Sequence, residues 1–166
     1  MANKYKFIDL FSGCGGFSTG LEMAGHKCLL GLDFQKEAVN SFAVNHPKAH
    51  AIHTDITKLS KKQLQEYINF SEVDMVVGGP PCQGFSTVGR GQVDDERNSL
   101  FQHFVRVVKM TNPKIVLFEN VTGILAKKNE KVLHKIFKSF ERLGYHMDAQ
   151  VMSADEYGVP SRRRRA

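Results

Sequence analysis

Short apolar runs alternate with amphipathic segments along the chain. Continuous apolar runs, such as 115–118, are typical of strands that are buried on both faces of a parallel sheet. Segments such as 97–110 carry apolar residues on one side at helical spacing. The expected strands are 6–11, 27–32, 50–53, 75–77, 115–118 and 145–153, and the expected helices are 17–24, 35–45, 61–69, 97–110 and 130–143. This alternation predicts an α/β fold with a mostly parallel sheet and helices on both faces.

Length and composition indicate one globular domain, residues 1–166, with a sizeable core. The sequence shows no apolar run of membrane-spanning length and no signal-peptide core, so we expect a cytoplasmic protein without membrane contact. Its three cysteines form no disulfide framework. The absence of a Cys-x-x-Cys pair or a clear ligand cluster argues against a metal site.

The positive charge of the chain is concentrated near its end. The net charge is +6, from 23 basic and 17 acidic residues, and four of the basic residues are the arginines at 162–165. Such a patch suits contacts with phosphate groups. A solvated, disordered tail is the alternative explanation for the same run.

A glycine-rich segment, residues 12–16, separates the first expected strand from the first expected helix. In this arrangement glycines let the backbone approach a ligand, and the helix N-terminus offers amide groups to it. Ser18 stands where the third glycine of Gly-x-Gly-x-x-Gly would be, so the dinucleotide fingerprint is incomplete. A Walker lysine does not follow the glycines either, which argues against ATP.

Acidic residues end the second and third expected strands. Asp33 lies 20 residues after Gly13, the spacing at which an acid binds both ribose hydroxyls. Asp33 could instead cap the following helix, but the spacing favours the ribose role. Phe34 could lie against an adenine, and Asp55 could accept a hydrogen bond from the adenine amino group. Together with the glycines, these residues predict a cofactor that contains adenosine.

A cysteine and a glutamate end two later strands. Cys82 follows the strand at 75–77, at the sheet edge where ligands collect in open α/β folds, and a long loop at 84–96 comes next. Its thiolate could be a nucleophile, although a free cysteine can also be an inert, buried residue. Glu119 ends the strand at 115–118. A thiolate and a carboxylic acid together suit addition to an electron-poor ring, with the acid protonating or hydrogen-bonding a ring nitrogen.

Four sequence motifs follow one another along the chain. They are Phe7-Ile8-Asp9-Leu10-Phe11-Ser12-Gly13-Cys14-Gly15-Gly16, Gly79-Pro80-Pro81-Cys82-Gln83-Gly84-Phe85-Ser86, Glu119-Asn120-Val121, and Tyr157-Gly158-Val159-Pro160 with Arg163 and Arg165. In these motifs and their order the chain resembles the catalytic domain of the cytosine-5 DNA methyltransferases, of the bacterial modification-methylase type. The resemblance covers nearly the whole chain and implies a Rossmann-like fold that uses S-adenosylmethionine.

The resemblance implies S-adenosyl-L-methionine as the cofactor and S-adenosyl-L-homocysteine as its product. Asp33 would hold the ribose, Phe34 with Asp55 and Ile56 would bind adenine, and the turn before Cys82 would approach the methionine end. The implied cofactor-binding residues are Phe11, Gly13, Cys14, Gly15, Gly16, Asp33, Phe34, Asp55, Ile56, Gly79, Pro81 and Leu100.

The resemblance also implies covalent catalysis on a cytosine that is flipped out of double-stranded DNA. Cys82 would add to C6 of the base, while Glu119 contacts N3 and the exocyclic amine. C5 would then attack the methyl group, and loss of the C5 proton would expel Cys82. Arg163 would position the base and the cysteine loop, Arg165 would contact the cytosine oxygen, and Asn120 would brace the loop that carries Cys82.

Two features depart from the family pattern. Ser161 stands where the family usually has a glutamine before its paired arginines. The sequence also stops at Ala166, inside the next expected strand, before a target-recognition domain and a C-terminal segment. A truncated chain, one subunit of a split enzyme and an incomplete chain all fit, so a second chain with the recognition domain is a possible partner. Residues 1–166 alone are expected to be inactive.

Other functions fit the same motifs. A tRNA cytosine-5 methyltransferase of the DNA-methylase-like family shares them, and a non-catalytic subunit of a split methylase would retain part of them. A zinc-dependent cytosine deaminase would need His-x-Glu and Pro-Cys-x-x-Cys, which the sequence lacks. The favoured prediction is a DNA (cytosine-5-)-methyltransferase in a bacterial restriction-modification system.

Overall fold

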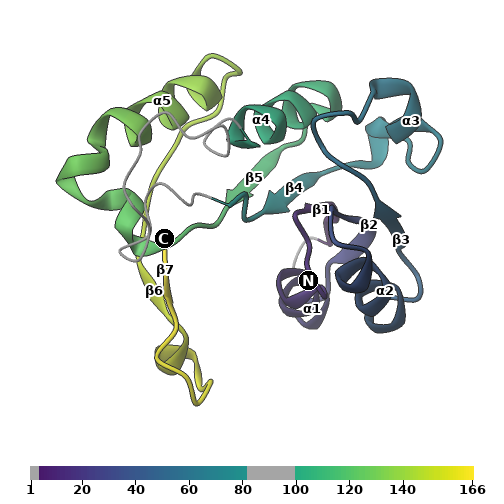
Figure 1. The fold of residues 1–166 in the computed structure, drawn as a ribbon, viewed down its shortest axis with the longest axis horizontal. Helices are drawn as coiled ribbons and strands as arrows, with labels where there is room; N and C mark the ends of the chain where they lie inside the picture. The colour runs from purple at the N-terminus through teal and green to yellow at the C-terminus, as the bar shows by residue number, and fades with distance from the viewer. Residues whose placement is uncertain (1–3, 82–99) are drawn as a thin grey trace. The chain divides into compact units, whose positions relative to one another are not determined.

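Five parallel strands form the main sheet of the structure, a computed structural model that describes residues 4–81 and 100–166. The strands lie in the order β3-β2-β1-β4-β5, which confirms the expected parallel sheet (Figure 1). The chain adds strands on one side of β1 and then on the other, so β1 and β4 flank the point at which ligands bind in open α/β sheets. The strands are β1 (Lys6–Leu10), β2 (Lys27–Asp33), β3 (His50–His53), β4 (Met75–Gly78) and β5 (Ile115–Phe118).

The chain divides into two units. The first consists of Met1–Pro80 with Arg106–Phe118 and contains the sheet. The second consists of Pro81–Val105 with Glu119–Ala166. Cys82 and the loop expected at 84–96 lie outside the described residues.

Helices connect the strands of the first unit. α1 and α2 pack on the face of the sheet that carries Phe7, and the right-handed rule for such connections places the part of α4 that belongs to this unit, from Arg106 onward, on the opposite face. α3 is shorter than the helix expected at 61–69: a capping box of Ser60 and Gln63 starts it, and a separate 3-10 turn, η1 (Phe70–Glu72), follows. The helices are α1 (Gly16–Met23), α2 (Lys36–Asn45), α3 (Lys61–Gln65) and α4 (Leu100–Thr111).

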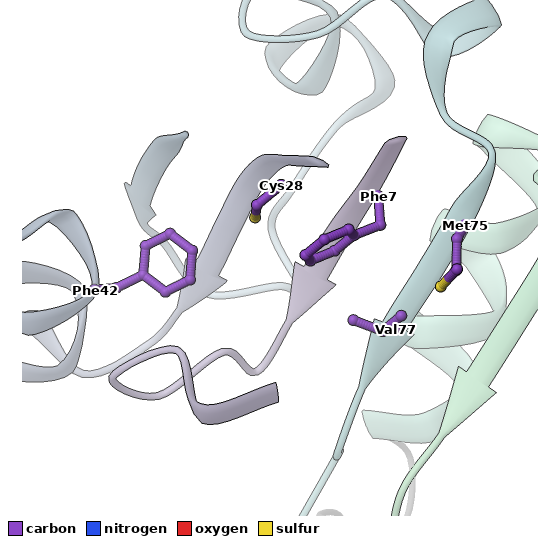
Figure 2. Close-up of a cluster of buried hydrophobic side chains, with 5 residues drawn as sticks. All are labelled: Phe7, Cys28, Phe42, Met75 and Val77. Carbon is purple, nitrogen blue, oxygen red and sulfur yellow. The ribbon is translucent and has the colours of Figure 1, made fainter. Parts of the chain in front are cut away.

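The core next to α1 and α2 is built from alternate strand residues. Figure 2 shows Phe7, Cys28, Phe42, Met75 and Val77, which form one buried cluster. Ile8, Leu30 and Val76 on the same strands are also buried, because both faces of the sheet are covered. The Phe42 ring lies directly over the backbone of β2: a Cβ atom at Gly31 would stand 2.2 Å from its Cζ.

The second unit contains α5 (Glu130–Glu141) and a two-stranded antiparallel sheet of β6 (Met152–Ser153) and β7 (Arg164–Arg165). The expected strand at 145–153 is therefore wrong for most of its length. Only Met152 and Ser153 pair, with Arg165 and Arg164 respectively. The remaining residues of that segment have no neighbouring strand among the described residues, and a sequence pattern alone does not supply the hydrogen bonds of a ladder.

Candidate active site

The glycine loop follows β1 and enters α1 through left-handed backbone conformations. Phe11 has φ 62°, Gly13 has φ 55° and Gly15 has φ 94°. A positive φ at a bulky residue such as Phe11 is uncommon and marks local strain, which concentrates at binding sites. Gly15 is the N-cap of α1, so the first amide groups of the helix lie next to the loop.

Asp33 ties the end of β2 to the glycine loop. Its Oδ2 atom accepts a hydrogen bond from the Gly13 amide at 2.8 Å, and its Oδ1 atom accepts one from the Gln35 amide at 2.9 Å. The N-cap of α2 is Gln35. The structure thus places Gly13 and Asp33 in contact, while the predicted bond from Asp33 to a ribose stays a prediction. Each carboxylate oxygen has a further lone pair, so both can still accept a bond from a ribose hydroxyl.

The residues predicted to bind adenine differ in their exposure. The Phe34 side chain is 69% exposed and free to lie against a ring. Asp55 is half-buried, and its Oδ1 atom accepts a bond from the Thr57 amide at 2.9 Å. Ile56 is only 3% exposed, so its side chain belongs to the core and only its backbone could reach a base.

Arg106 supports the segment after β3 that is predicted to bind adenine. The sequence did not reveal this role. Its guanidinium group donates to the carbonyl of Leu59 at 2.5 Å and to the carbonyl of Ile56 at 2.6 Å. The arginine comes from α4, about 50 residues away in the sequence, and helical spacing alone does not show which side chain reaches a loop.

One side of the glycine loop has room for a ligand. A Cβ atom added at Gly13 or Gly16 would meet no described atom within 4 Å. The Ser12 hydroxyl is buried and has no hydrogen-bond partner among the described residues, which is costly unless a ligand or water completes it. The Cys14 side chain is exposed in the same loop. An open, polar loop beside the Asp33 carboxylate fits an adenosine-containing cofactor.

Four other residues were predicted to contact the cofactor, and the structure gives their position in the chain and their unit. Phe11 is half-buried, and Gly79 follows β4 in the first unit. Pro81 and Leu100 belong to the second unit, so their part in the same pocket stays a prediction.

Glu119 lies beside both arginines predicted to act with it. Its Oε1 atom is 2.9 Å from Nε of Arg165 and 3.6 Å from Nη2 of Arg163. The backbone explains this approach: Val121 bridges Arg165, and Asn120 exchanges two backbone hydrogen bonds with Ala166, at 2.8 Å and 2.9 Å. The chain end therefore runs antiparallel to the segment after β5.

Asn120 is buried, and its Oδ1 atom accepts a bond from the Val121 amide at 2.9 Å. Its predicted role as a brace of the cysteine loop stays a prediction, because Cys82 lies outside the described residues.

Asp9 is a buried acid beneath the glycine loop. The Ser18 hydroxyl donates to its Oδ2 atom at 2.7 Å and lies 3.7 Å from the Cys28 sulfur. Burial raises the pKa of Asp9 to about 7, against the lowering effect of the Ser18 hydrogen bonds. Burial likewise raises the pKa of Cys28 to about 12, so this thiol is protonated at neutral pH.

The raised pKa of Asp9 predicts a loss of stability with rising pH. Between the ordinary value of 3.8 and about 7, the folded protein holds a proton that the unfolded chain releases. The free energy of unfolding should fall across this range, by at most about 4 kcal/mol for roughly three pKa units. Asp9→Asn should remove this slope in urea unfolding measured at a series of pH values. Asp148→Asn, at an exposed site, is the control, and an unchanged slope in D9N would contradict the assignment.

In residues 4–81 and 100–166, no helix has the length and apolar character needed to cross a membrane. Within the same residues, the side chains of His, Cys, Asp and Glu form no group of three that could hold a metal ion.

The chain is similar to known proteins in sequence and in fold. The family model of the C-5 cytosine-specific DNA methylases matches residues 5–166. The chain is 44% identical over 162 residues to the Type II methyltransferase M1.HphI of Haemophilus parahaemolyticus, covering 96% of this chain and 44% of the relative. It is 44% identical over 161 residues to the Type II methyltransferase M.DdeI of Desulfomicrobium norvegicum, covering 95% of this chain and 38% of the relative.

A crystal structure of an E. coli DNA modification methyltransferase encoded within a prophage has a similar fold. The TM-score is 0.82 and the identity is 35%, over 98% of this chain and 45% of that one. The chain thus spans less than half the length of each of these proteins.

Proposed function

The chain belongs to the C-5 cytosine-specific DNA methylase family, and from this premise we propose that it supplies the catalytic part of a DNA (cytosine-5-)-methyltransferase of a restriction-modification system. The observation that carries the proposal is the pairing of Glu119 with Arg165 and Arg163 at the end of β5. This pairing unites an acid, which can bond N3 and the exocyclic amine on the Watson–Crick edge of a flipped-out cytosine, with guanidinium groups, which can donate to the cytosine oxygen.

The proposed cofactor is S-adenosyl-L-methionine. Asp33 accepts hydrogen bonds from the ribose, Phe34 lies against the adenine, and the open side of the glycine loop faces the rest of the molecule. The Ser12 hydroxyl, which lacks a partner among the described residues, supports a polar ligand at this place. When bound, the cofactor supplies an electrophilic methyl group.

The proposed chemistry takes place on the cytosine ring. The Cys82 thiolate adds to C6, and Glu119 hydrogen-bonds N3 and the exocyclic amine, so that electron density collects at C5. Arg165 contacts the cytosine oxygen, and Arg163 holds Glu119 and the base in position. After methylation, removal of the C5 proton restores the aromatic ring and releases the Cys82 thiolate.

The proposed partner is double-stranded DNA, and the proposed location is the bacterial cytoplasm. We propose that residues 1–166 act as one catalytic domain, which depends on a target-recognition region for reading sequence. Phosphate contacts alone position a protein on DNA, while base contacts specify the site. The arginines at 162–165 suit the former task.

A labelled methyl-transfer assay tests the proposal. The protein is incubated with tritiated S-adenosylmethionine and either mixed-sequence DNA or bulk tRNA, with and without a chain that supplies the recognition region. We expect label in DNA, and bisulfite sequencing should place it at one defined cytosine. Label in tRNA alone would identify a tRNA methyltransferase. Cofactor binding without any transfer in all mixtures would identify a non-catalytic subunit.

Asp33→Ala should weaken binding of the cofactor about tenfold to a hundredfold. The variant loses charge-assisted hydrogen bonds to the ribose, worth about 1.5–3 kcal/mol in total. Calorimetric titration with S-adenosylhomocysteine measures the affinity. Asp148→Ala, at an exposed site, should bind normally. An unchanged affinity in D33A would mean that the carboxylate only ties β2 to Gly13.

A further inference from the structure

Two side chains at the end of α2 hold consecutive carbonyl groups of the glycine loop. Asn45, the last residue of the helix, donates from Nδ2 to the Cys14 carbonyl at 2.8 Å. His46, the next residue, has its Nε2 atom 3.1 Å from the Gly15 carbonyl. The loop is thus attached to an element that lies 31 residues further along the chain.

The His46 ring is buried and contacts side chains of both α1 and α2. It is 3% exposed, and its centroid lies 4.5 Å from that of the Phe42 ring. Its Nδ1 atom is 2.8 Å from a carboxylate oxygen of Glu22 on α1. A Cβ atom at Gly15 would stand 2.1 Å from Nε2, so the ring fills the space beneath this residue.

These two contacts and the first turn of α1 together hold the loop peptides. The Gly15 carbonyl also accepts bonds from the Thr19 amide at 2.8 Å and from the Thr19 hydroxyl at 2.9 Å. In a trans peptide the carbonyl and the following N–H group point in opposite directions. With the carbonyls of Cys14 and Gly15 directed at Asn45 and His46, the amides of Gly15 and Gly16 are directed away from α2. The Gly15 amide donates within the loop, to the Ser12 carbonyl at 2.9 Å. The Gly16 amide opens α1, beside space that is free of described atoms.

We propose that Asn45 and His46 are positioning residues for the methyl donor, which act through the carbonyls of Cys14 and Gly15 to hold in place the loop that presents the Gly16 amide to the cofactor. This inference rests on the proposed function, because it assumes that the cofactor lies on the open side of the loop. Neither side chain touches the cofactor itself.

The chemistry of His46 allows its two contacts to be separated. Its Nε2 atom faces the Gly15 carbonyl and the Thr19 hydroxyl, and its Nδ1 atom faces the Glu22 carboxylate. His46→Gln places an amide nitrogen near the former Nε2 position and keeps the loop contact. His46→Asn places one near the former Nδ1 position and keeps only the Glu22 contact. Both variants lose the ring that packs on Phe42.

The first test compares these two variants. Calorimetry with S-adenosylhomocysteine should show about threefold to tenfold weaker binding for H46N, the effect of one lost hydrogen bond, and nearly normal binding for H46Q. Thermal unfolding should lower the melting temperature of both by similar amounts, because both lose the same packing. Equal affinities for H46N and H46Q would reduce His46 to a packing residue and overturn the proposal for it.

The second test changes Asn45 and does not depend on cofactor binding. Asn45→Asp turns an acceptor toward the Cys14 carbonyl, while Asn40→Asp makes the same charge change at an exposed position of α2. Hydrogen exchange of the Gly15 amide, which shares a peptide with the Cys14 carbonyl and donates to the Ser12 carbonyl, should be faster in N45D and unchanged in N40D. Equal exchange in both would overturn the positioning role. If N45D loosens the loop but the wild type does not bind S-adenosylhomocysteine, the proposed cofactor is wrong while the loop attachment stands.

Discussion

Cys82→Ser is expected to lower the rate of methyl transfer by about three or more orders of magnitude. A serine hydroxyl is a far weaker nucleophile at neutral pH, because an alkoxide forms much less readily than a thiolate. Affinity for S-adenosylhomocysteine should stay close to that of the wild type, since the thiol attacks the base and does not hold adenosine. Single-turnover transfer of tritium to DNA measures the rate, and calorimetry measures the affinity.

Cys28→Ser is the matched control for this variant. Cys28 packs in the core, and burial raises its pKa to about 12, so it is not a source of thiolate. Its replacement should affect stability and leave the transfer rate unchanged. Transfer at nearly the wild-type rate by C82S would remove Cys82 from the mechanism and direct the search to another nucleophile.

Glu119→Gln is expected to slow single-turnover methyl transfer about a hundredfold to ten-thousandfold, the usual contribution of a general acid. The amide can still hydrogen-bond the cytosine ring but does not exchange a proton with N3. It also loses the carboxylate that Arg165 contacts at 2.9 Å, so the arginine is held less firmly. Affinity for DNA should change little, because Glu119 is one acid at the base and not a phosphate contact.

Glu141→Gln makes the same chemical change at the exposed end of α5, in the same unit, and should not alter the rate. DNA binding by fluorescence anisotropy separates the chemical step from recognition. An undiminished single-turnover rate in E119Q would show that the carboxylate does not take part in proton transfer. A lost affinity for DNA would instead make Glu119 a structural partner of the arginines.

The sheet and half of the candidate site follow from local patterns in the sequence. Parallel strands are continuous apolar runs, so β1, β4 and β5 could be located directly. The spacing between Gly13 and Asp33 predicted a ribose-binding acid at the end of the second strand. The structure places Asp33 beside the glycine loop, with a hydrogen bond of 2.8 Å from the Gly13 amide, and the ribose role stays a prediction.

The remaining features depend on contacts that local patterns do not encode. The partner of β6 is the short strand β7, and the pairing register was hidden because both strands have only two residues. Asn45 and His46 look like the ordinary end of a helix, and only the fold brings them beneath the glycine loop. In the sequence, Arg106 is an ordinary basic residue of an amphipathic helix. Only the structure shows that its guanidinium group donates to two carbonyls.

The Phe42 ring fills the space that a side chain at position 31 would need. The order in which these two positions change during evolution therefore matters. Any side chain at position 31 would collide with the aromatic ring, since even a Cβ atom would stand 2.2 Å from it. Overpacking of this kind is destabilising, whereas a smaller residue at position 42 first leaves a cavity and then makes room. The two positions are therefore epistatic: a lineage can enlarge residue 31 only after it has reduced residue 42, and while Phe42 remains, glycine at position 31 is retained.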